Sequence, residues 1–270
     1  MMGQRILITG GASGLGRALA EAWLQKGARV AIADVQAERL QQTQTELGEQ
    51  VLALRLDVRS EDDWAAAASA VEQAWGGLDV LVNNAGIASG GPVEREPLAE
   101  WERVLDINLL GLVRGVRACL PLLQQSRGRI LNVASMAGLI HPPMMGSYNA
   151  TKAAVVAWSE TLSFELEDQG IGVHVLCPGF FKTNLTESLP PQAAAMKAVL
   201  TRIFDRSGIS AEEVAAAALA GIQKGDFQIL SHPEGRAAWR MKRAFPDTLY
   251  RKLMKKQTAG MARAFAGKAP

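Results

Sequence analysis

The chain has 270 residues, of which 48% are hydrophobic and 21% charged, and its formal net charge at pH 7 is +2. This composition predicts a soluble single domain with a full hydrophobic core. It excludes a membrane-spanning class, because asparagines, prolines and a histidine interrupt the longest uncharged run, residues 130–151. No secretory leader is expected, and the three scattered histidines and two cysteines predict no metal site.

The first predicted elements are a strand, a glycine turn and a helix. Residues 6–8 are apolar, the turn after them contains Gly10, Gly14 and Gly16, and residues 17–24 have helical periodicity. Glycines in such a turn let the backbone approach a pyrophosphate, which also meets the free N–H groups of the helix. A tight turn needs glycine for steric reasons too, so the motif alone is weak evidence. Its place at the start of a βαβ unit favours a dinucleotide ligand.

A second predicted strand, residues 30–33, ends in Asp34. A carboxylate at this position accepts hydrogen bonds from the adenosine ribose and repels a 2′-phosphate, which favours NAD over NADP. Ser13 in the turn and Val35 and Gln36 after the strand are uncharged, so the neighbouring sequence offers no cation to a phosphate. The alternative is that Asp34 only terminates a strand.

Two later strand ends carry polar motifs. Asp57 and Val58 follow the apolar residues 51–56, and the sequence N-N-A-G at residues 83–86 follows residues 78–82. Strand and helix patterns alternate along the whole chain. The sequence therefore predicts an α/β fold with a doubly wound parallel sheet, the Rossmann fold.

Tyr148 and Lys152 are four residues apart, so on a helix they share one face. An ammonium close to a phenol favours the phenolate and lowers a pKa that starts near ~10. Such a tyrosine can take the proton from an alcohol as hydride leaves, or return it when a ketone is reduced. Ser135, after the strand at residues 130–133, can hold the substrate oxygen against the phenol. Taken singly, Tyr148 and Lys152 also fit a surface pair and Ser135 fits a turn.

The motifs in this order resemble the short-chain dehydrogenase/reductase family. They include T-G-x-x-x-G-x-G at residues 9–16, Y-x-x-x-K, and P-G-x-x-x-T at residues 178–183, and they span about residues 4–226. The resemblance implies an NAD-dependent oxidoreductase that acts on a secondary alcohol or ketone. It also implies that Lys152 holds the nicotinamide ribose and that Asn108 lies at a helix distortion that anchors a water molecule in the proton relay.

The resemblance also assigns the residues of the site. Thr183 resembles the family's contact to the nicotinamide carboxamide, although a threonine there equally suits a helix cap. The implied catalytic residues are Asn108, Ser135, Tyr148 and Lys152. The implied cofactor contacts are Gly10, Ser13, Gly14, Leu15, Gly16, Asp34, Val35, Asp57, Val58, Asn83, Asn84, Ala85, Gly86, Tyr148, Lys152, Pro178, Gly179, Phe181 and Thr183.

A different class of function is a protein that binds NAD(H) and senses redox state, or scaffolds a complex, without turnover. Such a protein needs the phosphate-binding half of the site but not Ser135, Tyr148 and Lys152, so their presence favours the enzyme. The expected partners are a small-molecule substrate and further copies of the chain. The resemblance implies a homodimer or homotetramer formed through the helices that carry Asn108 and Tyr148. No nucleic acid is expected.

The segment after Pro178 and Gly179 covers the substrate in the family, and here it is apolar. A flexible, methionine-lined pocket suits a lipid-like, steroid-like or other bulky substrate, although such residues also serve simply to pack a helix. His141 either lines this pocket or is a loop histidine with no role. The apolar residues of the predicted pocket are Met144, Met145, Leu189, Pro190, Pro191, Met196, Val199, Leu200 and Ile203.

The predicted dehydrogenase domain covers residues 1–231, and a basic extension covers residues 232–270. The extension has ten Lys or Arg against two Asp or Glu, a formal charge of +8, so the rest of the chain carries −6. Pro246 divides it into two short helical stretches in which apolar and basic residues alternate. Such a pattern can lie on an anionic membrane. The alternative, which we favour, is that its apolar face packs on the catalytic domain or a partner subunit.

The two cysteines indicate the compartment. Cys119 falls in a helical pattern and Cys177 just after a strand, so both are expected to be small buried residues. Unpaired cysteines fit a reducing compartment. The expected location is the cytoplasm, with a peripheral membrane contact if the basic extension binds lipid.

Overall fold

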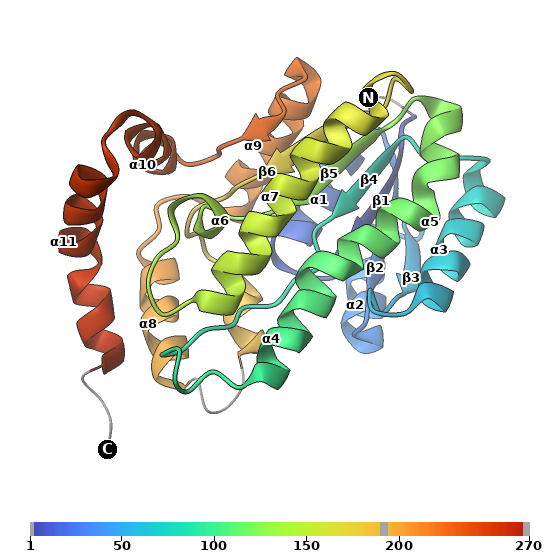
Figure 1. The fold of residues 1–270 in the computed structure, drawn as a ribbon. Helices are drawn as coiled ribbons and strands as arrows, with labels where there is room; N and C mark the ends of the chain where they lie inside the picture. Colours follow the sequence, from blue (N-terminus) through green and yellow to red (C-terminus); the bar gives the residue numbers. More distant parts are fainter. Residues whose placement is uncertain (1–2, 190–193, 267–270) are drawn as a thin grey trace.

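A computed structural model describes residues 3–189 and 194–266 (Figure 1). Its centre is a seven-stranded sheet in the order β3-β2-β1-β4-β5-β6-β7, and every neighbouring pair of strands is parallel. This confirms the predicted Rossmann fold. The strands are β1 (Arg5–Thr9), β2 (Arg29–Asp34), β3 (Leu52–Arg55), β4 (Val80–Asn83), β5 (Arg129–Val133), β6 (Gly172–Leu176) and β7 (Gln228–Ile229).

Helices cover both faces of the sheet. One core lies beneath α1 (Gly14–Leu24), α2 (Ala37–Leu47) and α9 (Ala211–Lys224). The opposite core lies beneath α3 (Glu61–Trp75), α5 (Gly111–Ser126) and α7 (Gly146–Glu167). The strands are mainly apolar in their middle residues because a parallel sheet is buried on both faces. Ile6, Leu7 and Ile8 of β1 show this, since all are fully buried.

Local sequence signals set the helix boundaries. The Ser60 hydroxyl accepts a hydrogen bond from the Asp63 amide at 3.0 Å and so caps the start of α3. Helix α3 ends at Gly76, whose φ of +70° lies in the left-handed region that favours glycine. Two further glycines have a packing role. A Cβ atom at Gly111 would lie 2.9 Å from Val58, and one at Gly115 would lie 2.6 Å from the Trp64 ring.

The helical run around Asn108 is interrupted. Helix α4 (Leu98–Leu105) passes into a π-helical segment, Asp106–Leu110, before α5 begins. The helix distortion that the family resemblance implied at Asn108 is therefore present. No helix in the described part of the chain is both long and apolar enough to cross a membrane.

The remaining helices gather at one end of the molecule, on the left in Figure 1. They are α6 (Ala137–Ile140), α8 (Ala194–Asp205), α10 (Pro233–Ala244) and α11 (Asp247–Ala266). A short 3₁₀ turn, Asn184–Ser188, leads into this region. The division between α10 and α11 falls at Pro246, as the sequence predicted.

The basic extension packs on the preceding part of the chain. The Tyr250 hydroxyl donates to the Ile140 carbonyl at 3.2 Å, and Lys242 Nζ donates to the Leu139 carbonyl at 2.5 Å. Trp239 Nε1 donates to Gln228 Oε1 at 3.0 Å. The inner face of the extension therefore packs on the protein, which is the alternative that we favoured over membrane binding.

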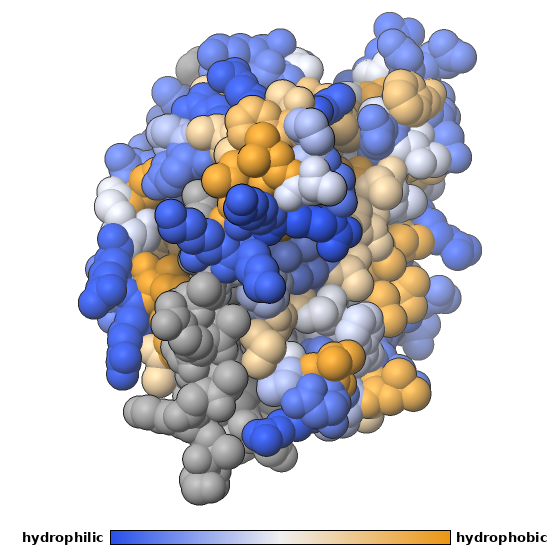
Figure 2. Space-filling model, turned by 60° about the vertical axis from the view of Figure 1, so that its left-hand side comes forward, coloured by the Kyte–Doolittle hydropathy of each residue, from blue (hydrophilic) through white to orange (hydrophobic). Residues whose placement is uncertain are grey.

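The outer face of the extension is cationic. Arg240, Arg243 and Lys252 are exposed, and so are the apolar Phe245 and Leu249, at 42% and 43%. Figure 2 shows hydrophilic and hydrophobic residues side by side on this side of the molecule. Peripheral membrane contact through this face stays a prediction. Both cysteines are free and buried, as expected.

Candidate active site

A cavity of about 1160 Å³ opens where the strands end at their carboxyl edge. One end is formed by the glycine turn after β1 and by Asp34. Ser135, Tyr148 and Lys152 line its wall, and helices α8, α10 and α11 contribute to its other end. Ligands of open α/β sheets bind at this edge, where the strand order reverses between β1 and β4.

The glycine turn has the shape of a phosphate cradle. Gly10 and Gly14 have φ values of +63° and +49°, which only glycine adopts easily. Ser13 precedes α1 without capping it through its side chain, so the N-terminal N–H groups of α1 keep their capacity for a ligand. A Cβ at Gly16 would lie 2.1 Å from the Gly10 carbonyl oxygen, so Gly16 lets the helix pack on the turn and does not itself line the cavity. The turn fits a dinucleotide pyrophosphate.

Asp34 ends β2 beside this turn and lines the cavity. Its carboxylate accepts hydrogen bonds from the Ala12 amide at 3.4 Å and the Gln36 amide at 3.0 Å. The immediate sequence neighbours of Asp34 carry no cation, but Arg39 and Arg59, which lie farther along the chain, also line the cavity. Arg39 is brought there by the first turn of α2, and Arg59 by the loop after β3. Each guanidinium has a carboxylate partner, Glu187 at 3.1 Å for Arg39 and Asp57 at 2.5 Å for Arg59.

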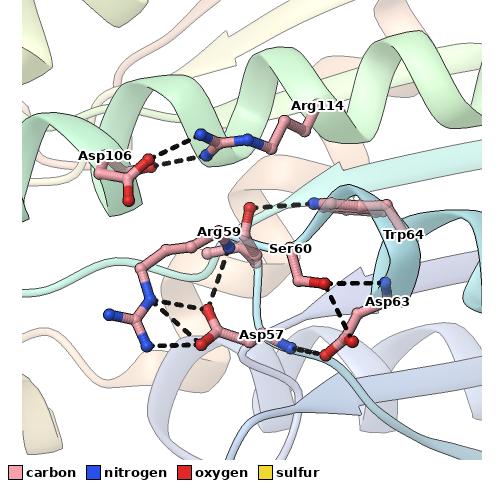
Figure 3. A network of polar contacts seen from close by, with 8 residues as sticks. Asp57, Arg59, Ser60, Asp63, Trp64, Asp106 and Arg114 are labelled. Atoms are coloured by element: carbon pink, nitrogen blue, oxygen red, sulfur yellow. Dashed lines mark hydrogen bonds and ion pairs between the residues drawn. The ribbon is translucent and has the colours of Figure 1, made fainter.

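Asp57 belongs to a polar network at the same end of the cavity (Figure 3). The Arg59 guanidinium donates to both carboxylate oxygens of Asp57, and these hydrogen bonds lower the pKa of that carboxyl. The Asp57 amide donates to Asp63 at 2.9 Å, and Trp64 Nε1 donates to the Val58 carbonyl at 3.2 Å. Asp57 and Val58 line the cavity. The hydrogen bonds with Asp63 and Trp64 hold their backbone in place.

The N-N-A-G motif divides into two parts. Asn84, Ala85 and Gly86 line the cavity, and the Asn84 and Ala85 amides both donate to Thr9 Oγ1 at 3.0 Å. Asn83 does not line the cavity. Its amide group donates to Asn132 Oδ1 at 2.9 Å in the interior, so it joins β4 to β5.

Asn108 is fully buried and does not line the cavity either. Its carboxamide forms two hydrogen bonds with Ile87, accepting from the amide at 2.8 Å and donating to the carbonyl at 2.9 Å. The side chain therefore fixes the loop just after Gly86. The π-helical backbone around Asn108 departs from α-helical pairing, which is common at functional sites.

Ser135, Tyr148 and Lys152 meet in the cavity wall. Ser135 follows β5, while Tyr148 and Lys152 lie one turn apart on α7 and are only 6% and 4% exposed. Lys152 Nζ donates to the Val133 carbonyl at 2.8 Å and lies 5.8 Å from the centroid of the Tyr148 ring. A phenol, a hydroxyl and an ammonium in this order can move a proton to and from a bound oxygen atom.

The expected lowering of the phenol pKa by Lys152 was wrong for the site as it stands. Burial raises the pKa of Tyr148 to about 12, and only the hydrogen bond with Ser135 lowers it. Burial likewise lowers the pKa of Lys152 to about 8, although the charge of Cys177 raises it. The helical spacing is as predicted, but both groups lose their hydration, and burial is the largest cause of each pKa shift.

The loop after β6 closes one side of the cavity. Pro178, Gly179, Phe181 and Thr183 all line it. Thr183 precedes the 3₁₀ turn but its side chain makes no capping hydrogen bond, so the helix-cap interpretation is not realised. A Cβ at Gly14 would lie 3.1 Å from Thr183 Oγ1, which places this hydroxyl against the glycine turn.

The substrate end is apolar, as predicted, but its residues differ in part. Of the expected residues, Met145, Leu200 and Ile203 line the cavity. Pro190 and Pro191 lie outside the described residues, and so does the side chain of Met196. Met144, Leu189, Val199 and His141 do not line the cavity. The remaining apolar lining includes Ile140, Pro142, Leu185, Phe204, Ala237, Ala238, Met241 and Met254.

Sequence reasoning missed that α10 and α11 form part of this wall. Met241 of α10 and Met254 and Thr258 of α11 face the cavity. The apolar positions of the extension were recognised as an amphipathic pattern, but amphipathic spacing does not say which surface a helix covers. His232, at the start of α10, was missed as well.

Comparisons with known proteins agree with this geometry. The sequence matches the short chain dehydrogenase family over residues 4–194. It is 38% identical over 191 residues to a 3-alpha-(or 20-beta)-hydroxysteroid dehydrogenase of Mycobacterium bovis, a match that covers 70% of this chain and 74% of that protein.

Solved structures are also similar. A short chain dehydrogenase/reductase from Burkholderia phymatum in complex with NAD has 33% sequence identity and a TM-score of 0.85, and the match covers 90% of this chain and 93% of that one. The 3-ketoacyl-(acyl-carrier-protein) reductase from Brucella melitensis complexed with NADH has 29% identity and a TM-score of 0.74, with 85% and 95% coverage.

Proposed function

The chain belongs to the short-chain dehydrogenase/reductase family, oxidoreductases that act on alcohols and ketones, and we propose that it exchanges a hydride between NAD(H) and a bulky apolar secondary alcohol or ketone. One observation carries this proposal. A single cavity joins the glycine turn, the Ser135, Tyr148 and Lys152 group, and an apolar wall. A redox sensor needs a site for the cofactor, but it needs neither the Ser135, Tyr148 and Lys152 group nor the apolar wall.

In the proposed reaction Tyr148 is the general acid and base. Its phenol, with a pKa raised to about 12, is protonated at neutral pH and can donate its proton to a ketone oxygen. Ser135 donates a hydrogen bond to the same oxygen and holds it against the phenol. The nicotinamide supplies the hydride, and the protein supplies position and charge. In the direction of oxidation the phenol must first lose its proton, which a cation close to the ring favours.

Lys152 and Asn108 have supporting roles in this proposal. Lys152, buried 5.8 Å from the Tyr148 ring, is placed to hold the nicotinamide ribose. Asn108 holds the loop after Gly86 through Ile87. Its π-helical backbone is the proposed anchor for a water molecule that relays protons. The further residues proposed to contact the cofactor all line the cavity, and they are Gly10, Ser13, Gly14, Leu15, Asp34, Val35, Asp57, Val58, Asn84, Ala85, Gly86, Pro178, Gly179, Phe181 and Thr183.

The preference for NAD rests on Asp34. A carboxylate ~4 Å from a phosphate in a partly screened site is repelled by up to ~4 kcal/mol, and every ~1.4 kcal/mol is a factor of ten. Arg39 and Arg59 could offset this by binding a phosphate, but each would have to leave its carboxylate partner. The similar structures from Burkholderia phymatum and Brucella melitensis, which hold NAD and NADH, support the same preference.

The substrate class rests on the apolar wall. Met241, Met254 and Phe204 offer flexible and aromatic surface but few polar partners. The hydroxysteroid dehydrogenase of Mycobacterium bovis is a relative whose name indicates a substrate of this bulky kind. We therefore place lipid-like and steroid-like alcohols and ketones ahead of small polar ones.

A turnover screen tests the proposal. The purified protein is assayed with NAD(H) and NADP(H) against small polar and bulky apolar secondary alcohols and ketones. We expect turnover of bulky members, with kcat/KM at least about tenfold higher for NAD(H). Tight NADH binding without turnover of any member would support the sensor alternative. Equal kcat/KM for the two cofactors would contradict the role of Asp34.

A further inference from the structure

His232 connects two parts of the cavity that are far apart in sequence. It follows β7, precedes the first turn of α10, and is 4% exposed. Its Nδ1 accepts a hydrogen bond from the Gly179 amide at 3.0 Å, and its Nε2 lies 3.1 Å from the Phe180 carbonyl oxygen. The ring therefore bonds on both sides to the loop after β6.

The two partners define the protonation state of the ring. A backbone amide can only donate, so Nδ1 must carry no proton, whereas a carbonyl oxygen can only accept, so Nε2 must carry one. Both bonds are satisfied together by a single species, the neutral imidazole protonated at Nε2. Ser231 Oγ, 2.9 Å from Nδ1, then acts as a second donor to this nitrogen.

The packing around the ring is equally specific. A Cβ atom at Gly179 would lie 2.9 Å from the His232 ring, so the ring occupies the space that any larger residue at position 179 would need. The Phe181 ring lies on another side, with the two ring centroids 6.4 Å apart. His232, Gly179 and Phe181 line the cavity, and so does Gly235 in the first turn of α10.

We propose that His232 is a positioning residue that clamps the loop at residues 178–181 to the start of α10. The clamp fixes the distance between the loop expected to face the cofactor and the helix that forms part of the substrate wall. Its consequence for catalysis rests on the function proposed above, whereas the clamp itself exists in the protein without cofactor.

The charges around the ring set the direction of its pH response. Burial lowers the pKa of His232 below its ordinary value of 6.5, although the Phe180 carbonyl, Glu234 of α10 and Glu213 of α9 all favour the cation. The ring is therefore neutral at pH 7. Protonation of Nδ1 would place a second N–H group against the Gly179 N–H, and two donors cannot form a hydrogen bond with each other. The clamp should therefore open when the pH falls below the pKa of His232.

The test is made first on the protein without cofactor, by nitrogen NMR of the imidazole and by hydrogen exchange of the Gly179 amide. We expect His232 to be neutral with its proton on Nε2 at pH 7. His232→Phe keeps an aromatic ring but loses both hydrogen bonds. In this variant we expect the Gly179 amide hydrogen to exchange at least about tenfold faster than in the wild type. A proton on Nδ1 at pH 7, or unchanged exchange in His232→Phe, would overturn the proposal.

A matched pair of substitutions keeps the test independent of folding defects. His232→Asn retains an acceptor near the position of Nδ1 and should preserve most of the protection of Gly179, but without the loss of protection at acid pH that the wild type shows. His141→Asn, at an exposed histidine outside the cavity, should resemble the wild type in exchange and in pH response. If His232→Asn showed the same acid-induced loss of protection as the wild type, the proposed protonation of His232 would be wrong.

Kinetics then connect the clamp to the site. In His232→Phe we expect KM for the substrate to rise about tenfold while kcat changes less, because the acid and base at Tyr148 are untouched. An unchanged KM would overturn the link between the clamp and the substrate wall. A protein that turns over no substrate would contradict the proposed function, and the exchange and NMR results on the clamp would still stand.

Discussion

In the proposed function, the two ends of the cavity recognise their ligands by different means. At the nucleotide end, the groups that meet the ligand are largely backbone: the glycine turn, the N-terminus of α1 and the amides after β4. At the substrate end they are side chains from α8, α10 and α11. Backbone recognition needs particular residues at fixed spacing, so it leaves a motif. Recognition by apolar side chains needs only volume and hydrophobicity, so in the sequence it appears as an apolar composition without a fixed motif.

The two ends should also differ in tolerance. A methyl group at Gly16 would collide with the Gly10 carbonyl, whereas an apolar wall accepts swaps that conserve volume. Between them lies the buried group of Tyr148 and Lys152, which is proposed to contact both the cofactor and the substrate. Substitutions at the three places should therefore separate catalysis, cofactor choice and substrate binding.

The largest effect is expected at Tyr148. Tyr148→Phe removes the acid and base, so kcat should fall by at least about a hundredfold, within the usual contribution of a positioned proton donor. The dissociation constant for NADH should stay nearly unchanged. Tyr250→Phe is the matched control, because this second tyrosine does not itself line the cavity, although its hydroxyl donates to the Ile140 carbonyl. Steady-state kinetics of both variants decide, and a Tyr148→Phe enzyme with most of its activity would contradict the mechanism.

A smaller effect is expected at the nucleotide end. Asp34→Asn keeps the shape of the side chain but removes the charge, so the ratio of kcat/KM for NAD to that for NADP should fall about tenfold. Glu38→Gln, at an exposed position in the first turn of α2, should leave the ratio unchanged. The ratio is measured for both variants and the wild type. If Asp34→Asn kept the wild-type ratio, another group would have to select the cofactor.

A comparable effect, confined to the substrate, is expected at Met241. Met241→Asp places a carboxylate in the apolar wall, and burial of a polar group without a partner costs roughly 1–3 kcal/mol. The KM for a bulky ketone should rise about tenfold, and cofactor affinity should not change. Met241→Leu conserves volume and should change KM less than about threefold. Equal effects of the two substitutions would mean that α10 does not form part of the substrate site.

The smallest effect is on stability. Lys152→Met removes a buried ammonium and should raise the free energy of unfolding of the cofactor-free protein by on the order of 1 kcal/mol at pH 7. Burial lowers the pKa of Lys152 from 10.5 to about 8, so between these values the unfolded state holds more protons. The free energy of unfolding of the wild type therefore rises with pH between about 8 and 10.5.

The difference in the free energy of unfolding between Lys152→Met and the wild type should accordingly shrink above pH 8. Denaturant unfolding at a series of pH values measures it. Lys26→Met, at an exposed lysine, is the control and should show no such trend. A Lys152→Met protein less stable than the wild type at pH 7 would show that the bond from Lys152 to the Val133 carbonyl outweighs the cost of burying the ammonium.

Sequence reasoning was most informative where geometry demands a residue type. The order of strands and helices followed from apolar runs and glycine turns, and the helical spacing of Tyr148 and Lys152 placed both in one wall. The division of the basic extension into two helices at Pro246 was also predicted correctly. In each case the cause is local, within a few residues of chain.

What the sequence could not supply depends on contacts across the fold. Asn83 looks like its neighbour Asn84 in sequence, yet it pairs with Asn132 in the interior because it still belongs to β4. The raised pKa of Tyr148 depends on burial by several elements. His232 meets Gly179 across 53 positions of chain, and no periodicity predicts such a contact.

Transfer of a labelled hydride tests the proposed activity most directly. The protein is incubated with NADH that carries deuterium at the transferable position of the nicotinamide and with a bulky apolar ketone, and the alcohol formed is analysed by mass spectrometry. We predict one deuterium at the carbinol carbon with the wild-type protein, and at least about a hundredfold less labelled alcohol with Tyr148→Phe at equal NADH occupancy. NADH binding without deuterium in any alcohol across the ketone panel would contradict the proposed activity and leave a protein that only binds the cofactor.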